Sequence, residues 1–114
     1  MIDHRHYSYR VFWSDEDEAF VGVCAEFPRV SHIDDDPDSA FRGIIDLIGH
    51  AVEMLAEDGD PIPEPLNSRK YSGRFHVRVT PEIHRNLVME AAEQGVSLNR
   101  HVSAKLADKH VLLR

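Results

Sequence analysis

The sequence has little of what marks secreted, disulfide-bonded or membrane proteins. Its single cysteine, Cys24, cannot form an internal disulfide bond or a paired-cysteine metal site. No apolar run approaches the roughly 20 residues that a bilayer-spanning helix needs. The first thirty residues carry scattered charges and the acidic run 15–18, which is unlike a secretory signal. We therefore expect a cytoplasmic protein that makes no membrane contact.

Motifs of enzymes and metal sites are also missing. The sequence has no Gly-x-Ser-x-Gly elbow, glycine-rich phosphate loop, His-Glu-x-x-His motif or Cys/His finger spacing. Cys24 lies in an apolar stretch, where a buried small side chain is favoured over a reactive thiol. The eight histidines are scattered, apart from the short pair His4 and His6. We expect no catalytic residue, no cofactor and no metal.

What the sequence does have is an uneven distribution of charge. Residues 1–68 carry 16 acidic and four basic side chains, a net charge of −12, whereas residues 69–114 carry nine basic and four acidic ones, a net charge of +5. Between these parts, Pro61, Pro63 and Pro65 fix backbone angles and remove amide donors. The sequence predicts a domain at 1–60, a stiff linker at 61–71 and a second domain at 72–114. Only the basic domain is suited to nucleic acid.

The first domain is predicted to be a small antiparallel sheet covered by one helix, an α+β fold. Alternating apolar residues predict strands at 7–13 and 19–25, and a short third strand is expected at 30–33. Asp36, Pro37 and Gly59 stand where a helix needs an N-cap, a first residue and a C-terminal stop. An apolar stripe with helical spacing runs between them, at Phe41, Ile44, Ile45, Ile48, Val52 and Leu55.

The second domain is predicted to be one strand followed by two helices. Apolar residues alternate with basic ones over 74–79. Thr80 and Pro81 predict the start of a helix that Gly95 ends, and Ser97 predicts the cap of the next helix. A lone strand leaves its backbone unpaired, and about 40 residues bury too little surface to fold alone. Two chains are therefore expected to pair their strands into a ribbon.

This basic strand is the strongest functional signal in the sequence. A two-stranded ribbon fits the major groove of B-DNA, where an arginine contacts guanine through two hydrogen bonds. Free amide groups at the start of the second helix would anchor a phosphate. The alternative interpretation is the solvated face of an edge strand. The residues expected to contact DNA are Arg74, His76, Arg78, Ser97 and Asn99.

Segments 72–85 and 95–99 together resemble the ribbon-helix-helix domain of HicB-type antitoxins. The aromatic-rich hairpin, the acidic turn before the helix and the proline-rich exit resemble the other half of that family. The resemblance implies a partial RNase H-like N-terminal domain that lacks nuclease activity and binds HicA, a small basic toxin that cleaves mRNA. It also implies a homodimer or higher homo-oligomer that represses its own operon by binding operator double-stranded DNA. His76 departs from many related sequences, which leaves the operator sequence open.

The acidic first domain suits a basic toxin by its charge. The residues expected to contact the toxin are Asp34, Asp35, Asp36 and Asp38, and the alternative is a helix cap with a solvated loop. The acidic run 15–18 is a second candidate, for which the alternative is a solvated hairpin turn. A nuclease that uses these carboxylates is disfavoured, because two-metal chemistry needs carboxylates from separate elements. A ribbon-helix-helix regulator whose N-terminal domain senses a metal or small ligand is the main alternative function.

Overall fold

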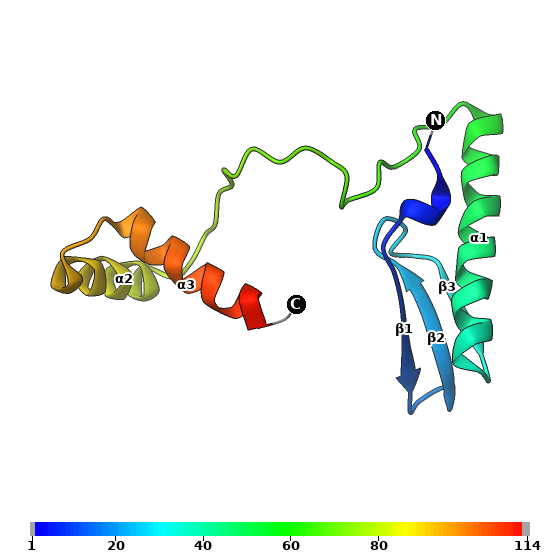
Figure 1. Ribbon diagram of the computed structural model, residues 1–114, viewed down its shortest axis with the longest axis horizontal. Coiled ribbons are helices and arrows are strands. Elements are labelled where there is room, and N and C mark those ends of the chain that lie inside the picture. Colours follow the sequence, from blue (N-terminus) through cyan, green and yellow to red (C-terminus); the bar gives the residue numbers. More distant parts are fainter. Residues whose placement is uncertain (1, 113–114) are drawn as a thin grey trace. The chain divides into compact units, whose positions relative to one another are not determined.

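The computed structural model describes residues 2–112. The chain divides into two compact units, unit 1 (Met1–Ser72) and unit 2 (Gly73–Arg114). Unit 1 holds the 3-10 turn η1 (His4–His6), the strands β1 (Tyr9–Ser14), β2 (Ala19–Cys24) and β3 (Ser31–Asp34), and the helix α1 (Pro37–Asp58). Unit 2 holds the helices α2 (Pro81–Gln94) and α3 (Leu98–Leu112) (Figure 1). This confirms the α+β class, and none of the described helices is long and apolar enough to span a membrane.

The sheet of unit 1 has the strand order β1-β2-β3 and is antiparallel in both ladders. Tyr9 lies opposite Cys24 in the first ladder, and Phe20 lies opposite Asp34 in the second. The predicted hairpin and third strand are confirmed. The first strand begins at Tyr9 rather than at Tyr7, because the amide of Tyr7 closes the η1 turn with a hydrogen bond of 3.3 Å.

Helix α1 begins and ends at the residues that the sequence predicts. The Asp36 carboxylate accepts a hydrogen bond from the Ser39 amide at 3.0 Å, and Pro37 is the first helical residue. Gly59 ends the helix in the left-handed region, with φ of 72°, where a side chain would be strained. The residues at its two caps, Asp36 and Gly59, therefore account for where the helix begins and ends. This helix covers one face of the sheet (Figure 1).

The core of unit 1 lies between α1 and the sheet. Ile44 and Ile48, two members of the predicted stripe, are fully buried against Tyr7 and Cys24. Cys24 is 1% exposed, which confirms the predicted buried side chain, and this burial raises the pKa of its thiol to about 11. Phe41 was expected in the same stripe but is 45% exposed, because it lies at the margin of the helix–sheet contact.

The helices of unit 2 also begin and end as predicted. The Thr80 hydroxyl accepts an amide hydrogen bond of 3.2 Å from the first turn of α2, and Gly95 ends that helix with φ of 70°. The Ser97 hydroxyl accepts an equivalent bond of 3.1 Å from the first turn of α3. Residues 74–79 belong to no strand or sheet within the described chain, although the sequence predicts a strand there. The ribbon therefore stays a prediction.

The proline-rich segment after α1 lies against unit 1. Its residues 61–66, which we call the strap, include the buried Pro65. The Tyr7 hydroxyl donates to the Pro63 carbonyl at 2.7 Å, and the Leu66 amide donates to the Glu26 carboxylate at 2.8 Å. The predicted linker over 61–71 thus begins with residues that are attached to the first unit.

Gly22 in the central strand allows α1 to approach the sheet closely. A Cβ atom at this position would lie 2.7 Å from the Ala40 carbonyl oxygen and 2.9 Å from the Ile44 Cβ. We expect Gly22→Ala to lower the free energy of unfolding by about 1–3 kcal/mol, as overpacking of a core does. Urea denaturation measures this change. The exposed Ser31→Ala serves as the control in the same sheet, and a Gly22→Ala protein as stable as that control would contradict the close approach.

Candidate nucleic-acid interface and acidic cluster

The segment 74–80 is exposed at every side chain. The exposed fraction is 75% for Phe75, 61% for Val77 and 47% for Val79. These apolar side chains alternate with the three basic residues that we expect to contact DNA. Apolar surface of this extent is unfavourable in water, and the described residues of unit 2 do not cover it. In the single chain, the basic and the apolar side chains of this segment are therefore both exposed.

Two grooves of unit 2 run beside this segment. Arg74 and Asn99 line the first groove together with apolar residues of α3. His76 and Arg78 line the second, where His84 of α2 adds another imidazole. The fold of one chain thus brings four of the five predicted DNA contacts to two neighbouring grooves. It does not gather them at one point.

The fifth predicted residue, Ser97, has a structural role at the start of α3. Its hydroxyl accepts the Arg100 amide hydrogen bond of 3.1 Å, and its carbonyl accepts the His101 amide at 3.0 Å. The side chain is therefore engaged as the helix cap. Amide groups in the first turn of a helix lack intrahelical acceptors and favour an anion. Asn99 lies in that turn and is exposed.

The contact between α2 and α3 contains a polar group that the sequence did not reveal. His101 is only 6% exposed, and its Nε2 atom lies 2.7 Å from the Glu90 carboxylate. The Lys105 ammonium lies 3.3 Å from the same oxygen. The hydrogen bond with His101, and then that with Lys105, hold the pKa of the Glu90 carboxyl below its usual range. A charged carboxylate on α2 therefore joins two residues of α3.

The acidic residues expected to contact a toxin lie in succession, from the end of β3 to the first turn of α1. The Asp34 carboxylate lies 3.3 Å from the Nε2 atom of His32, and Asp36 is the helix cap. Asp35 and Asp38 are exposed. The capping alternative is therefore confirmed for Asp36. No three metal-ligating side chains converge within the part of the chain that the structure describes.

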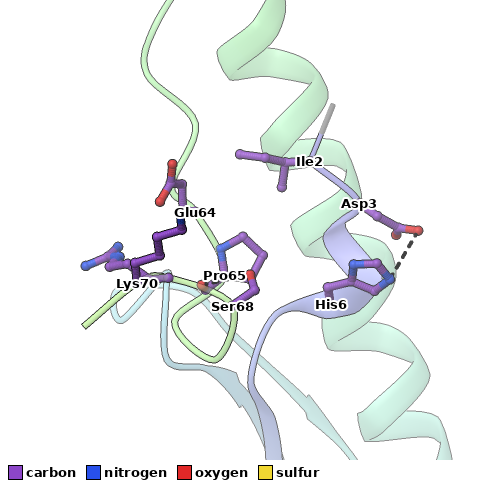
Figure 2. Close-up of a pocket in the computed structure, with 8 residues that line it drawn as sticks. Ile2, Asp3, His6, Glu64, Pro65, Ser68 and Lys70 are labelled. Carbon is purple, nitrogen blue, oxygen red and sulfur yellow. Dashed lines mark hydrogen bonds and ion pairs between the residues drawn. The ribbon is translucent and has the colours of Figure 1, made fainter. Parts of the chain in front are cut away.

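A polar groove lies in unit 1, where the segment after α1 passes the N-terminal turn (Figure 2). The Asp3 carboxylate there is paired with Arg5 at 2.7 Å, and this hydrogen bond lowers the pKa of the Asp3 carboxyl. Acidic and basic side chains both line the groove, so its charge favours neither anions nor cations. Its lining residues are Ile2, Asp3, His6, Glu64, Pro65, Ser68, Arg69 and Lys70.

Comparison with known protein families gives one match. The model of the HicB family matches residues 59–106, which include the strap, the basic segment 74–80, α2 and much of α3. The comparisons with curated proteins and with solved structures give no match. The matched residues contain the two segments, 72–85 and 95–99, whose motifs resemble HicB-type antitoxins. Residues 59–106, somewhat less than half of the chain, are thus similar to the HicB family.

Proposed function

We propose that this chain is an antitoxin that binds and neutralises a HicA-type, mRNA-cleaving ribonuclease and represses its own operon. The match to the HicB family supports a function related to toxin–antitoxin systems. The observation that carries the proposal is the division into two units of opposite charge. Unit 1 has 16 acidic and six basic residues, whereas unit 2 has seven basic and four acidic ones. The chain itself is proposed to catalyse nothing.

Unit 2 is the proposed DNA-binding and dimerisation unit. Among its described side chains only Ala91 and His101 are buried, which is little core for an independent fold. Antiparallel pairing of 74–79 from two chains would satisfy the backbone groups of both segments. It would also cover their apolar side chains and turn the basic ones toward a major groove. The start of α3 would then hold a phosphate beside the groove.

Unit 1 is the proposed toxin-binding unit. A protein that cleaves mRNA binds a polyanion, so its surface is expected to be basic and attracted by acidic residues. Because Asp36 is engaged as the helix cap, the exposed Asp35 and Asp38 are the residues of the acidic cluster best placed to pair with such a partner. Charge complementarity of this kind raises association rates and depends on salt.

The toxin-binding proposal is tested by co-expression with the open reading frame that neighbours the gene, which we expect to encode a small basic protein, and by purification through a tag on that neighbour. We expect a stable complex that relieves the neighbour's toxicity, and the fragment 1–72 should suffice for it. The double variant Asp35→Asn/Asp38→Asn should weaken the complex roughly fivefold, by about 1 kcal/mol. The matched control, Glu53→Gln/Glu57→Gln, removes two exposed acids further along α1 and should bind normally. Absence of a complex would contradict the proposal.

Repression is tested with Arg78→Ala and DNA from upstream of the chain's own gene. If Arg78 contacts a base, its removal should weaken specific binding by about 1–3 kcal/mol and leave toxin binding unchanged. Arg85→Ala, which removes an equal charge from the exposed surface of α2, is the control. Mobility-shift titration measures both variants. Equal effects of the two substitutions would show that Arg78 contributes only general charge, and loss of toxin binding would invert the assignment of the units.

A further inference from the structure

The path of the chain after α1 is not that of a free linker. Beyond Gly59 the chain runs along unit 1 through the strap, whose three prolines make it stiff. Ile62 and Pro63 are half-buried, and Pro65 is buried. Figure 2 shows Pro65 and Ser68 in the segment that passes the N-terminal turn. The strap therefore packs on the folded body of unit 1.

Two hydrogen bonds distant in sequence fasten this strap. The Tyr7 hydroxyl donates to the Pro63 carbonyl at 2.7 Å, over a separation of 56 residues. The Leu66 amide donates to the Glu26 carboxylate at 2.8 Å, over 40 residues. Tyr7 is itself a core residue, only 5% exposed, with its ring edge-to-face against Phe27 at 5.4 Å. One of the two anchors is therefore rigid.

The second anchor, Glu26, connects three parts of unit 1. One carboxylate oxygen accepts the Ser8 amide at 2.9 Å, and the other accepts the Ser8 hydroxyl at 3.2 Å and the Leu66 amide at 2.8 Å. Burial alone would raise the pKa of Glu26, but the amides of Leu66 and Ser8 outweigh it and lower the pKa. Hydrogen bonds to a charged carboxylate are stronger than those between neutral groups. Glu26, two residues after β2, thus joins the strap to Ser8, the residue that precedes β1.

The residues that follow the strap make local bonds. The Ser68 amide donates to the Pro65 carbonyl at 3.2 Å, and the Tyr71 hydroxyl donates to the Leu66 carbonyl at 2.6 Å. Both partners lie within five residues along the chain. These bonds join neighbouring residues within the segment 65–71.

We propose that Tyr7 and Glu26 clamp the strap to unit 1, and that this clamp restricts the connection between the two units to residues 67–72. Fully extended, the path from Leu66 to Gly73 spans at most about 25 Å, whereas release of the strap would extend it to about 45 Å, counted from Asp60. A shorter connection raises the effective concentration of one unit around the other. The clamp does not rest on the proposed function. If that function also holds, the clamp keeps a bound toxin within short reach of bound DNA.

Amide hydrogen exchange of the full chain, followed by NMR, tests the clamp directly. Alanine at position 26 offers no accepting oxygen, so Glu26→Ala leaves both the Ser8 and the Leu66 amides without their acceptor. We expect the Leu66 amide to exchange at least about tenfold faster in this variant. Glu64→Ala removes a carboxylate of the strap that is exposed, and it serves as the matched control. Unchanged exchange at Leu66 in a folded Glu26→Ala protein would overturn the clamp.

The consequence for reach is tested by electron–electron distance measurements between spin labels at Glu57→Cys and Glu93→Cys. Cys24 is buried and its thiol pKa is raised to about 11, so it stays unlabelled. Dilution with unlabelled protein isolates the distances within one chain. Tyr7→Phe/Glu26→Ala, which removes both anchoring groups, should extend the upper limit of the distances by about 20 Å. Tyr7→Phe alone keeps the core ring and tests the Pro63 bond if the double variant fails to fold. Distances equal to those of the unaltered chain in folded clamp variants would overturn the proposed limit.

Discussion

The backbone N–H and C=O groups of a single extended segment cannot bond to one another, so they need a partner outside the segment. The account of unit 2 rests on this constraint. Its segment 74–79 has no ladder partner in the described chain and exposes Phe75, Val77 and Val79 to water. The two helices contribute a small contact, in which Glu90 and His101 hold α2 and α3 together. Pairing with a second chain would supply both the missing hydrogen bonds and the missing core. The same pairing would create the basic ribbon, so folding and the proposed DNA binding have one physical origin.

Unit 1 follows a different principle, because it has a core of its own. Ile44 and Ile48 of α1 pack on a sheet in which Gly22 permits the close approach. Most of its acidic side chains are exposed, whereas Asp36 caps the helix and Glu26 accepts hydrogen bonds from the strap. Asp3 and Asp34 are half-buried and pair with Arg5 and His32. A stable scaffold with unpaired acidic side chains such as Asp35 and Asp38 suits recognition of a basic protein. The two units therefore divide the proposed functions by charge.

The sequence predicted those features that depend on local chemistry. The caps at Asp36, Thr80 and Ser97, the glycine stops and the antiparallel strands all follow from short patterns of residues, and the structure confirms them. The clamp of Tyr7 and Glu26 was missed, because its partners are 56 and 40 residues apart and no periodicity marks them. His101 was missed for a similar reason, since its burial depends on Glu90 in the neighbouring helix.

The candidate site was predictable only in part. The alternation over 74–79 identified exposed basic and apolar residues, but one chain cannot show the ribbon that would align them. Likewise, the sequence revealed the acidic cluster and offered the helix cap as the alternative role of Asp36, and the hydrogen bond from the Ser39 amide decides for the cap. In a single chain, a contact surface for another chain can be recognised only as surface that the fold of that chain leaves exposed. Such surface identifies the interface without naming the partner.

The central claim is that unit 2 is completed by a second copy of the chain, and the molar mass of the purified protein in solution tests it most directly. Light scattering during size-exclusion chromatography should give twice the chain mass of 13.0 kDa, or a higher even multiple, at micromolar concentration. A mass of 13.0 kDa over the whole accessible concentration range would contradict the account. The exposed segment 74–79 would then have to find its partner elsewhere.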